Sequence, residues 1–453
     1  MKYPAAFFRV VVVAGSLALA GLISVSAQPP APPSAPAAKA PVLKDAMGNT
    51  LRRAPTGHIT NYDEAKVGTY TLPDPLMLQN GRPVRDAAAW AKRRAEILAL
   101  YETHIFGRVP KSAPKARFEV VETDPAAMEG TAVRKRVVMR FGEKADGPAV
   151  NVVIYLPAKA TGPVPLVLSL SFVGGMPAGA AVATPAAGTA TAPAVVAPAR
   201  PPGRGEPIAE ILARGFGYAI LRYTEIQPDN AAGRTKGVMG LALAPGQTEF
   251  APDEWGTISA WAWGLSRVQD YLETDRAVDA KRVAIVGHSR LGKSVLWAGA
   301  QDTRFALVYS SQGGEMGSAL SRRDYGETVD DMAANFGYQF AGNFQKFAGH
   351  WNDMPVDAHM LIALSAPRPL LVSTGSGDKW SDPRGAFLAM VAAGPVYRLL
   401  GQTDLGTAEM PALDQPVITG TLGYLEHDGP HVISPLDWTT FLDFAGRQLN
   451  VQR

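Results

Sequence analysis

The fold of this chain is decided by the stretch Arg282-Val283-Ala284-Ile285-Val286-Gly287-His288-Ser289-Arg290-Leu291-Gly292-Lys293. The apolar run that opens it predicts a β-strand, and the residues from about Ser294 onward predict a helix. A strand, a sharp turn and a helix in this order expose a serine hydroxyl at the carboxyl edge of a sheet, as a nucleophile elbow does. The second glycine comes one residue later than in the usual G-x-S-x-G pattern. An ordinary helix-capping serine in a tight turn is therefore the alternative interpretation.

Short apolar strands alternate with helical segments along most of the chain. The predicted strands are residues 133–141, 150–156, 166–172, 218–222, 283–286, 306–310 and 370–373. The predicted helices are residues 88–101, 208–212, 258–273, 293–300, 360–364 and 438–444. Nearly continuous apolar strands separated by helices indicate a parallel sheet that is covered on both faces. With the serine turn, this pattern predicts an α/β-hydrolase fold, a three-layer αβα sandwich with a mostly parallel central sheet.

The composition is that of an ordinary globular protein. Of its 453 residues, 47% are hydrophobic and 19% are charged, which excludes a wholly disordered, collagen-like or coiled-coil chain. The formal net charge of +3 predicts no basic face, and we expect no nucleic-acid partner. Because the chain has no cysteine, it forms neither a disulfide nor a thiolate metal site.

The first residues indicate export. Lys2 and Arg9 precede an apolar run from Val10 to Val25, and Val25-Ser26-Ala27 supplies small residues for cleavage. We predict a signal peptide over residues 1–27 and a periplasmic or secreted protein. The alternative is an uncleaved membrane anchor, but the run is shorter than a spanning helix needs, so we expect no stable membrane insertion after cleavage.

Two further segments are rich in alanine and proline. Residues 28–43 predict a flexible leader, and residues 176–205 predict a low-complexity surface insertion, with an ordered lid as the alternative. No other boundary divides the chain convincingly. We therefore predict one catalytic domain over residues 44–453, and a monomer.

An acid and a base follow the serine in the order expected for this fold. Asp378 lies in a Gly-rich loop just after a predicted strand, and His431 lies in the loop Gly429-Pro430-His431. A serine needs an imidazole base, and the imidazolium needs a carboxylate. Asp382, which precedes a proline, is better explained as a helix cap, and His427 is the alternative base.

The combined motifs resemble carbohydrate esterase family 15, the glucuronoyl esterases, in its bacterial form. The resemblance rests on Gly287-His288-Ser289-Arg290-Leu291-Gly292-Lys293, on Asp378-Lys379-Trp380-Ser381-Asp382-Pro383, and on Gly429-Pro430-His431 with Asp437-Trp438. It extends to residues 366–369 and 320–323. The late glycine matches the G-x-S-R-x-G pattern of that family.

The resemblance implies a role for each of seven residues. Ser289 would be the nucleophile, His431 the base and Asp378 the acid, and Arg290 would support the oxyanion. Sugar-binding positions of the family match Lys293, Glu327 and Trp380. From the residues alone, these three are equally explained as a solvated lysine, a salt-bridge partner and a core tryptophan.

Two segments depart from the family pattern. Gln312 stands where many members have a catalytic glutamate, and a neutral amide cannot stabilise an imidazolium by charge, so the acid role falls on Asp378. Glu315 is a possible substitute, although its register is wrong. Tyr338-Gln339 stands in place of a His-Trp pair, which affects the expected sugar contacts.

The sequence thus predicts a serine esterase that cleaves esters between (4-O-methyl-)glucuronic acid of glucuronoxylan and lignin alcohols. No cofactor and no metal are expected. Two alternatives remain: another carbohydrate esterase, such as an acetylxylan esterase, and a non-catalytic hydrolase-fold protein that binds carbohydrate.

Overall fold

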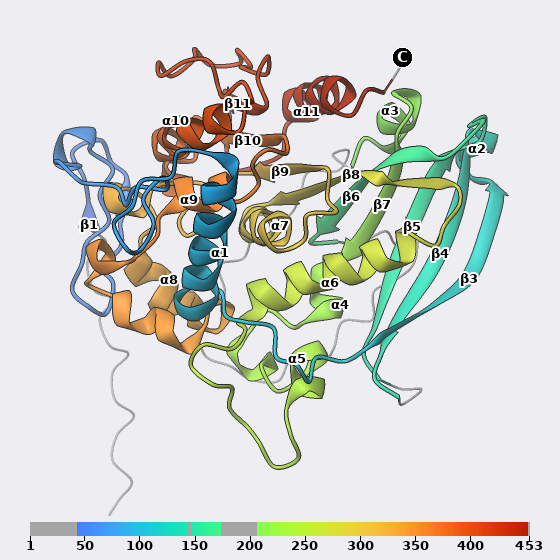
Figure 1. The fold of residues 1–453 in the computed structure, drawn as a ribbon, viewed down its shortest axis with the longest axis horizontal. Helices are drawn as coiled ribbons and strands as arrows, with labels where there is room; N and C mark the ends of the chain where they lie inside the picture. The colour runs from blue at the N-terminus through green and yellow to red at the C-terminus, as the bar shows by residue number, and fades with distance from the viewer. Residues whose placement is uncertain (1–42, 144–146, 174–205, 452–453) are drawn as a thin grey trace, which may run out of the picture. The chain divides into compact units, whose positions relative to one another are not determined.

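A nine-stranded sheet forms the centre of the structure (Figure 1). The computed structural model describes residues 43–143, 147–173 and 206–451. In spatial order the strands are β11 (Leu422–His427), β10 (Leu370–Gly375), β9 (Leu307–Ser311), β8 (Val278–His288), β6 (Val164–Ser171), β7 (Gly217–Arg222), β5 (Ala149–Pro157), β4 (Ala132–Phe141) and β3 (Ala116–Ala126). The run from β11 to β7 is parallel, and the pairs β7–β5, β5–β4 and β4–β3 are antiparallel. Strand β6 lies between β7 and β8, so the strand order changes direction at β6. Ligands bind at such switch points in open α/β sheets.

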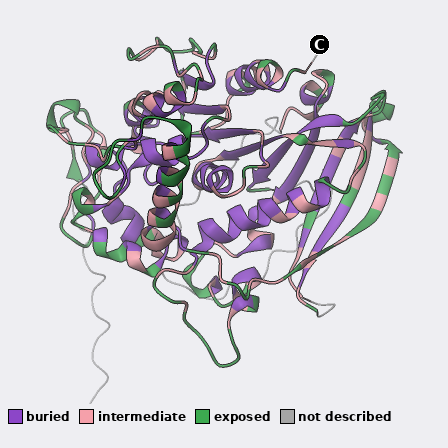
Figure 2. Cartoon of the chain, viewed as in Figure 1, coloured by how far each residue is buried: buried purple, intermediate pink, exposed green. Residues whose placement is uncertain are grey.

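Helices cover both faces of the sheet, as the predicted three-layer fold requires. One face packs against α3 (Ile208–Ala213) and α11 (Pro435–Gln448). The other face packs against α6 (Thr257–Leu272), α7 (Arg290–Gln301), α9 (Ala358–Ala363) and α10 (Pro383–Leu399), with α1 (Ala87–His104) outside them. Figure 2 shows α6 and α7 buried along most of their length, whereas α1 keeps an exposed side. The serine turn therefore leads into a helix that the core holds on all sides.

Short elements complete the described chain. They are the strand pair β1 (Leu43–Lys44) and β2 (Thr50–Leu51), and the helices α2 (Ala127–Gly130), α4 (Tyr223–Ile226), α5 (Gly237–Ala242) and α8 (Val329–Phe336). The predicted signal peptide, almost all of the leader and the insertion at 176–205 lie outside the described residues. Leu43, the last residue assigned to the leader, begins β1. Among the residues that the structure describes, no helix combines the length and the apolar character needed to cross a membrane.

The predicted strands and helices all coincide with observed elements, but several observed elements were not predicted, among them β3, β11 and α10. Strand β3 lies at the sheet edge, and most of its residues are exposed or half-buried, so its sequence lacks a long apolar run. Strand β11 contains a glycine and a glutamate, yet all six of its residues are buried. Helix α10 contains Pro395, which local rules assign to a helix break.

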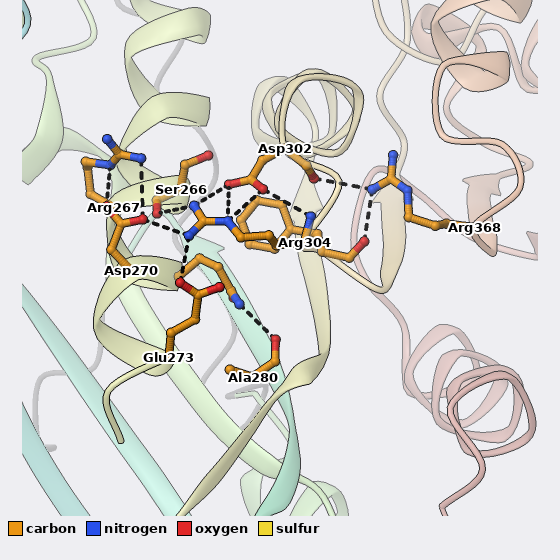
Figure 3. A network of polar contacts seen from close by, with 10 residues as sticks. Ser266, Arg267, Asp270, Glu273, Ala280, Asp302, Arg304 and Arg368 are labelled. Carbon is orange, nitrogen blue, oxygen red and sulfur yellow. Dashed lines mark hydrogen bonds and ion pairs between the residues drawn. The ribbon is translucent and has the colours of Figure 1, made fainter. Parts of the chain in front are cut away.

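A polar network ties the C-terminal ends of α6 and α7 together (Figure 3). The Arg304 guanidinium contacts Asp270 at 2.9 Å, Glu273 at 3.0 Å and Asp302 at 2.7 Å. Arg368 donates to the Phe305 carbonyl at 2.9 Å, and burial lowers the pKa of this guanidinium to about 10. These contacts fix the far end of the helix that begins at the serine turn.

The N-terminal segment of the described chain is attached to the loop before α8. His58 Nε2 lies 2.9 Å from Asp324 Oδ1, and the His58 ring packs edge-on against Trp351. The Gly326 amide donates to the Asn61 carbonyl at 2.8 Å. The contact with Asp324 raises the pKa of His58 above its usual value.

We expect His58→Gln to lower the free energy of unfolding by up to about 1 kcal/mol at pH 5.5, as for other partly exposed ion pairs. Because the pKa of His58 is raised in the folded protein, its ion pair with Asp324 contributes fully to stability below the unfolded-state pKa near 6.5. That contribution is lost as the pH rises through the higher folded-state pKa. Urea unfolding of both chains at pH 5.5 and pH 8.5 measures the difference. His350→Gln is the control, because His350 forms no ion pair among the described residues. A destabilisation that grows with pH would contradict the prediction.

Candidate active site

Ser289 occupies a strained turn between β8 and α7. Its backbone has φ 60° and ψ −130°, a conformation that residues other than glycine rarely adopt. It is the N-cap residue of α7, but its side chain forms no capping hydrogen bond, which excludes the interpretation as an ordinary capping serine. The strain holds the hydroxyl at the carboxyl end of β8, where a nucleophile is exposed.

Glycines on either side make this turn possible. A Cβ on Gly287 would lie 2.2 Å from the Leu291 carbonyl oxygen. A Cβ on Gly292 would lie 2.9 Å from Ser310 Oγ and 3.0 Å from the Ser311 oxygen of β9. Gly292, which lies one residue later than in the usual G-x-S-x-G pattern, is therefore required where α7 crosses β9 closely.

Asp378 and His431 follow two later strands and contact each other. Asp378 follows β10 and His431 follows β11, and Asp378 Oδ2 lies 2.5 Å from His431 Nδ1. The Gly377 amide donates to the Gly429 carbonyl at 2.9 Å, which links the two loops. Since the Asp378 side chain is 7% exposed and that of His431 is 39% exposed, the carboxylate is buried behind an imidazole that reaches solvent. This is the arrangement that orients an imidazole for proton transfer.

One cavity of about 540 Å³ brings the predicted residues together. Its lining includes all seven of them: Ser289, Arg290, Lys293, Glu327, Asp378, Trp380 and His431. Within the described residues, no hydrogen bond joins Ser289 to His431, and such contacts are often loose without a substrate. The His288 ring lies 4.5 Å from the His431 ring, between centroids, and forms part of the same wall.

Arg290 is held by a carboxylate that sequence reasoning missed. Its Nη1 lies 2.5 Å from Asp229 Oδ2, and Asp229 also accepts from Tyr223 at 2.8 Å, Tyr338 at 2.9 Å and Gln339 at 3.0 Å. Burial opposes the guanidinium charge, but Asp229 outweighs it and raises the pKa of Arg290. Tyr338 and Gln339 thus support, through Asp229, the arginine that follows Ser289.

Lys293 and Glu327 pair beneath the cavity. Their Nζ and Oε2 atoms lie 3.5 Å apart, and both side chains are buried. The Glu327 amide donates to the Trp380 carbonyl at 2.7 Å. Lys293 is therefore not a solvated helix residue. Glu327 is a salt-bridge partner that also faces the cavity.

Trp380 forms a wall of the cavity and is only half-buried, so it is not a core residue. The Arg52 guanidinium lies 4.4 Å from its ring centroid, a cation–π contact. Arg52 follows β2 in the N-terminal segment and also lines the cavity. Among the described residues, no carboxylate lies within ion-pair distance of this arginine.

The alternative acids and bases have other partners. Asp382 caps α10 by accepting from the Gly385 amide at 2.9 Å and pairs with Arg323 at 2.8 Å. Glu315 is buried beside Ser321, whose hydroxyl lies 2.5 Å from it, and burial raises the pKa of this carboxyl well above its usual value. His427 is buried and pairs with Asp437 at 2.9 Å. Asp382, Glu315 and His427 are also absent from the cavity lining.

The described residues contain no group of three or more histidine or carboxylate side chains arranged to hold a metal ion. The arrangement of Ser289, His431 and Asp378 suits nucleophilic attack on a carbonyl with general-base help.

Comparison with known proteins identifies similar chains. The family profile described as "Glucuronyl esterase, fungi" matches residues 180–401. A carbohydrate esterase from an unknown prokaryotic organism is 40% identical over 400 residues, which are 86% of this chain and 92% of that protein. A glucuronoyl esterase from Solibacter usitatus has 44% identity and a TM-score of 0.77 over 85% of this chain and 99% of its own. A structure described as a promiscuous CE15 esterase from a marine bacterial metagenome has 40% identity and a TM-score of 0.76 over 86% of this chain and 100% of its own.

Proposed function

The chain belongs to carbohydrate esterase family 15, the glucuronoyl esterases, and from this membership we propose that it hydrolyses esters between (4-O-methyl-)glucuronic acid of glucuronoxylan and lignin alcohols. One observation carries the proposal. Ser289 lines the same cavity as the His431–Asp378 pair, at the carboxyl ends of β8, β10 and β11. A nucleophile, a base and an acid from three separate strands meet there.

The reaction proceeds through an acyl-enzyme. His431 removes the proton of Ser289 as the hydroxyl oxygen attacks the ester carbonyl of the uronate, and Asp378 stabilises the imidazolium that forms. The negative charge that develops on the carbonyl oxygen faces the Arg290 amide, which has no acceptor within α7, and the Arg290 guanidinium. His431 then gives its proton to the leaving alcohol. Water attacks the acyl group in the same way and releases the uronate.

The other residues that line the cavity include a polar group and an apolar group. Lys293, Glu327 and Trp380 offer an ammonium, a carboxylate and an indole, which suit the hydroxyls and ring of a sugar. Phe172, Met332 and Phe336 offer apolar surface, which suits an aromatic alcohol. Both halves of a sugar–lignin ester thus have matching surface in one cavity.

The test is hydrolysis of the benzyl ester of glucuronic acid by the purified chain from Gln28 to Arg453, with acetylated xylan as a parallel substrate. We expect uronate release with little acetate. Acetate release without uronate would overturn the proposal in favour of another carbohydrate esterase. Release of neither product, with retained binding to glucuronoxylan, would favour a non-catalytic binding protein.

We also propose that the protein is exported, to the periplasm or beyond the cell, and acts as a monomer. The proposal of export rests on Lys2, Arg9 and the apolar run that follows them. An exported esterase would meet polymeric plant material, which does not enter a cell. Fractionation of expressing cells and sedimentation of the purified chain test the two statements, and a cytoplasmic location or a stable dimer would contradict them.

Arg52→Ala is expected to raise KM for the benzyl ester about two- to fivefold and to leave kcat nearly unchanged, since an exposed cation–π contact contributes about 0.5–1 kcal/mol. The physical reason is that the guanidinium holds one face of Trp380 and adds donors to the sugar-binding wall. Arg53→Ala is the control. It removes the same charge one residue away, where the guanidinium instead donates to the Gly57 carbonyl. Equal effects of both substitutions, or a loss confined to kcat, would contradict the prediction.

A further inference from the structure

Two buried side chains bind the backbone on either side of His431. Gln312 Nε2 donates to the Val432 carbonyl at 2.6 Å, and His427 Nε2 lies 3.2 Å from the Pro430 carbonyl. Gln312 is 1% exposed and His427 is 2% exposed. The carbonyl of the residue before His431 and the carbonyl of the residue after it thus each face a buried side chain from outside the loop.

The amide of Gln312 is needed as a donor. Gln312 lies in the turn after β9 with a positive φ of 49°, and its backbone amide donates to the Ser373 carbonyl of β10 at 2.7 Å. A carbonyl oxygen only accepts hydrogen bonds, so the side-chain atom that faces Val432 must carry hydrogen. An ionised carboxylate at this position would direct an acceptor at another acceptor.

Acceptors face both ring nitrogens of His427. Its Nδ1 lies 2.9 Å from Asp437 Oδ2, and its Nε2 faces the Pro430 carbonyl. Burial opposes the charge, but Asp437 outweighs it and raises the pKa of His427. Asp414, before β11, adds to this effect, and Glu426 of β11 is the neighbouring carboxyl. Asp437 is itself fixed, because it accepts from the Ser434 amide at 2.6 Å at the start of α11.

Further hydrogen bonds hold the loop around His431. The Val432 amide donates to the Pro430 carbonyl at 2.9 Å, and the Gly429 amide donates to Ser376 Oγ at 3.2 Å. Gly377 binds the Gly429 carbonyl, and Ser376 binds the His427 carbonyl at 3.0 Å. The placement of His431 then depends on the peptide groups at Pro430 and Val432, and so does its 2.5 Å contact with Asp378. A displacement of about 1 Å at a catalytic group can reduce a rate about 100-fold.

We propose that Gln312 and His427 are positioning residues that clamp the backbone on both sides of the general base His431. The inference rests on the proposed function, because it takes His431 as the base. It gives Gln312 a role as a hydrogen-bond donor that a glutamate would not perform. Gln312 does not act as an acid in this role.

Gln312→Glu tests the clamp. Gln312 lines the cavity, but its amide nitrogen is directed at Val432. We expect kcat for the benzyl ester to fall about 10- to 100-fold with KM changed less than about twofold, because the base is displaced while Lys293, Glu327 and Trp380 are unchanged. Gln448→Glu is the matched control, since Gln448 also donates its amide to a backbone carbonyl, that of Gly420 at 2.8 Å, away from the cavity. Gln312→Met, which loses the donor without adding a charge, should give a smaller loss.

A proton NMR measurement separates this inference from the proposed function. The proton shared between His431 Nδ1 and Asp378 should give a strongly downfield signal that is absent from Asp378→Asn. We expect that signal to be lost or broadened in Gln312→Glu and in His427→Gln, while thermal unfolding shows both chains folded. Full activity and an unchanged signal in Gln312→Glu would overturn the clamp. If the wild-type chain cleaves no uronate ester, the proposed function fails, but the signal still tests the clamp.

Discussion

Ser289→Ala is expected to lower kcat for uronate ester hydrolysis by about 10⁵- to 10⁶-fold, which is the scale measured when the serine of a comparable triad is removed. Without the hydroxyl, no acyl-enzyme forms, and His431 has no proton to accept from a nucleophile. The remaining rate comes from water that the Arg290 amide and guanidinium still assist. Steady-state kinetics on the benzyl ester, with enzyme in the micromolar range, measures this residual rate.

The same substitution should leave binding and folding intact. Alanine lacks only the hydroxyl, and Ser289 forms no side-chain capping bond that α7 would lose. Calorimetric titration with the methyl ester of glucuronic acid should therefore give an affinity within about threefold of the wild-type KM, as expected when uniform binding is kept. Ser112→Ala is the control, because that hydroxyl donates to the Ala242 carbonyl at 2.7 Å outside the cavity. Retention of more than about one per cent of the activity in Ser289→Ala would mean that another group is the nucleophile.

The sequence predicted those parts of the fold whose signals are local. The second half of strand β8 is apolar, and the turn that follows it sterically requires Gly287 at the end of β8 and Gly292 in the first turn of α7, so both the strand and the elbow were visible in a dozen residues. Strand β11 gave no such signal, because its burial comes from β10 on one side and from α10 and α11 against it. Helix α10 begins with an Asp-Pro cap that could have been read, but its internal proline and glycines masked the helical pattern.

In the candidate site too, residues marked by local sequence patterns were predicted and residues placed by long-range contacts were not. Ser289, Asp378 and His431 follow strands, and the parallel sheet brings the carboxyl ends of those strands to one edge. Asp229 lies 61 residues before Arg290, in a turn without any motif, and only the folded chain shows that the two are paired. Arg52 reaches Trp380 from the N-terminal segment, and no sequence motif marks this arginine. Residues whose role depends on long-range contacts were therefore beyond local reasoning.

The identity of the acid is the last point on which the sequence left alternatives, and Asp378→Asn decides it. We expect kcat to fall about 10³- to 10⁴-fold with little change in KM, because an asparagine favours the wrong imidazole tautomer and removes the charge that stabilises the imidazolium. No neighbour can compensate. Gln312 is uncharged and donates to Val432. Glu315 is buried against Ser321 outside the cavity, and burial raises the pKa of its carboxyl well above its usual value.

Asp382→Asn is the control for the loss of a carboxylate in the same loop, because Asp382 caps α10 and pairs with Arg323 outside the cavity. It should lower the melting temperature, since one partner of a buried ion pair is removed, and should leave kcat of the folded enzyme within about threefold. Asp378→Asn should show the opposite pattern, a large loss of kcat with a nearly unchanged melting temperature, because the partner His431 reaches solvent. A loss of kcat below about tenfold in Asp378→Asn would assign the acid role to another residue. The double substitution Asp378→Asn with Glu315→Gln would then test Glu315. If Glu315 replaces Asp378 as the acid, the two losses of kcat are strongly non-additive.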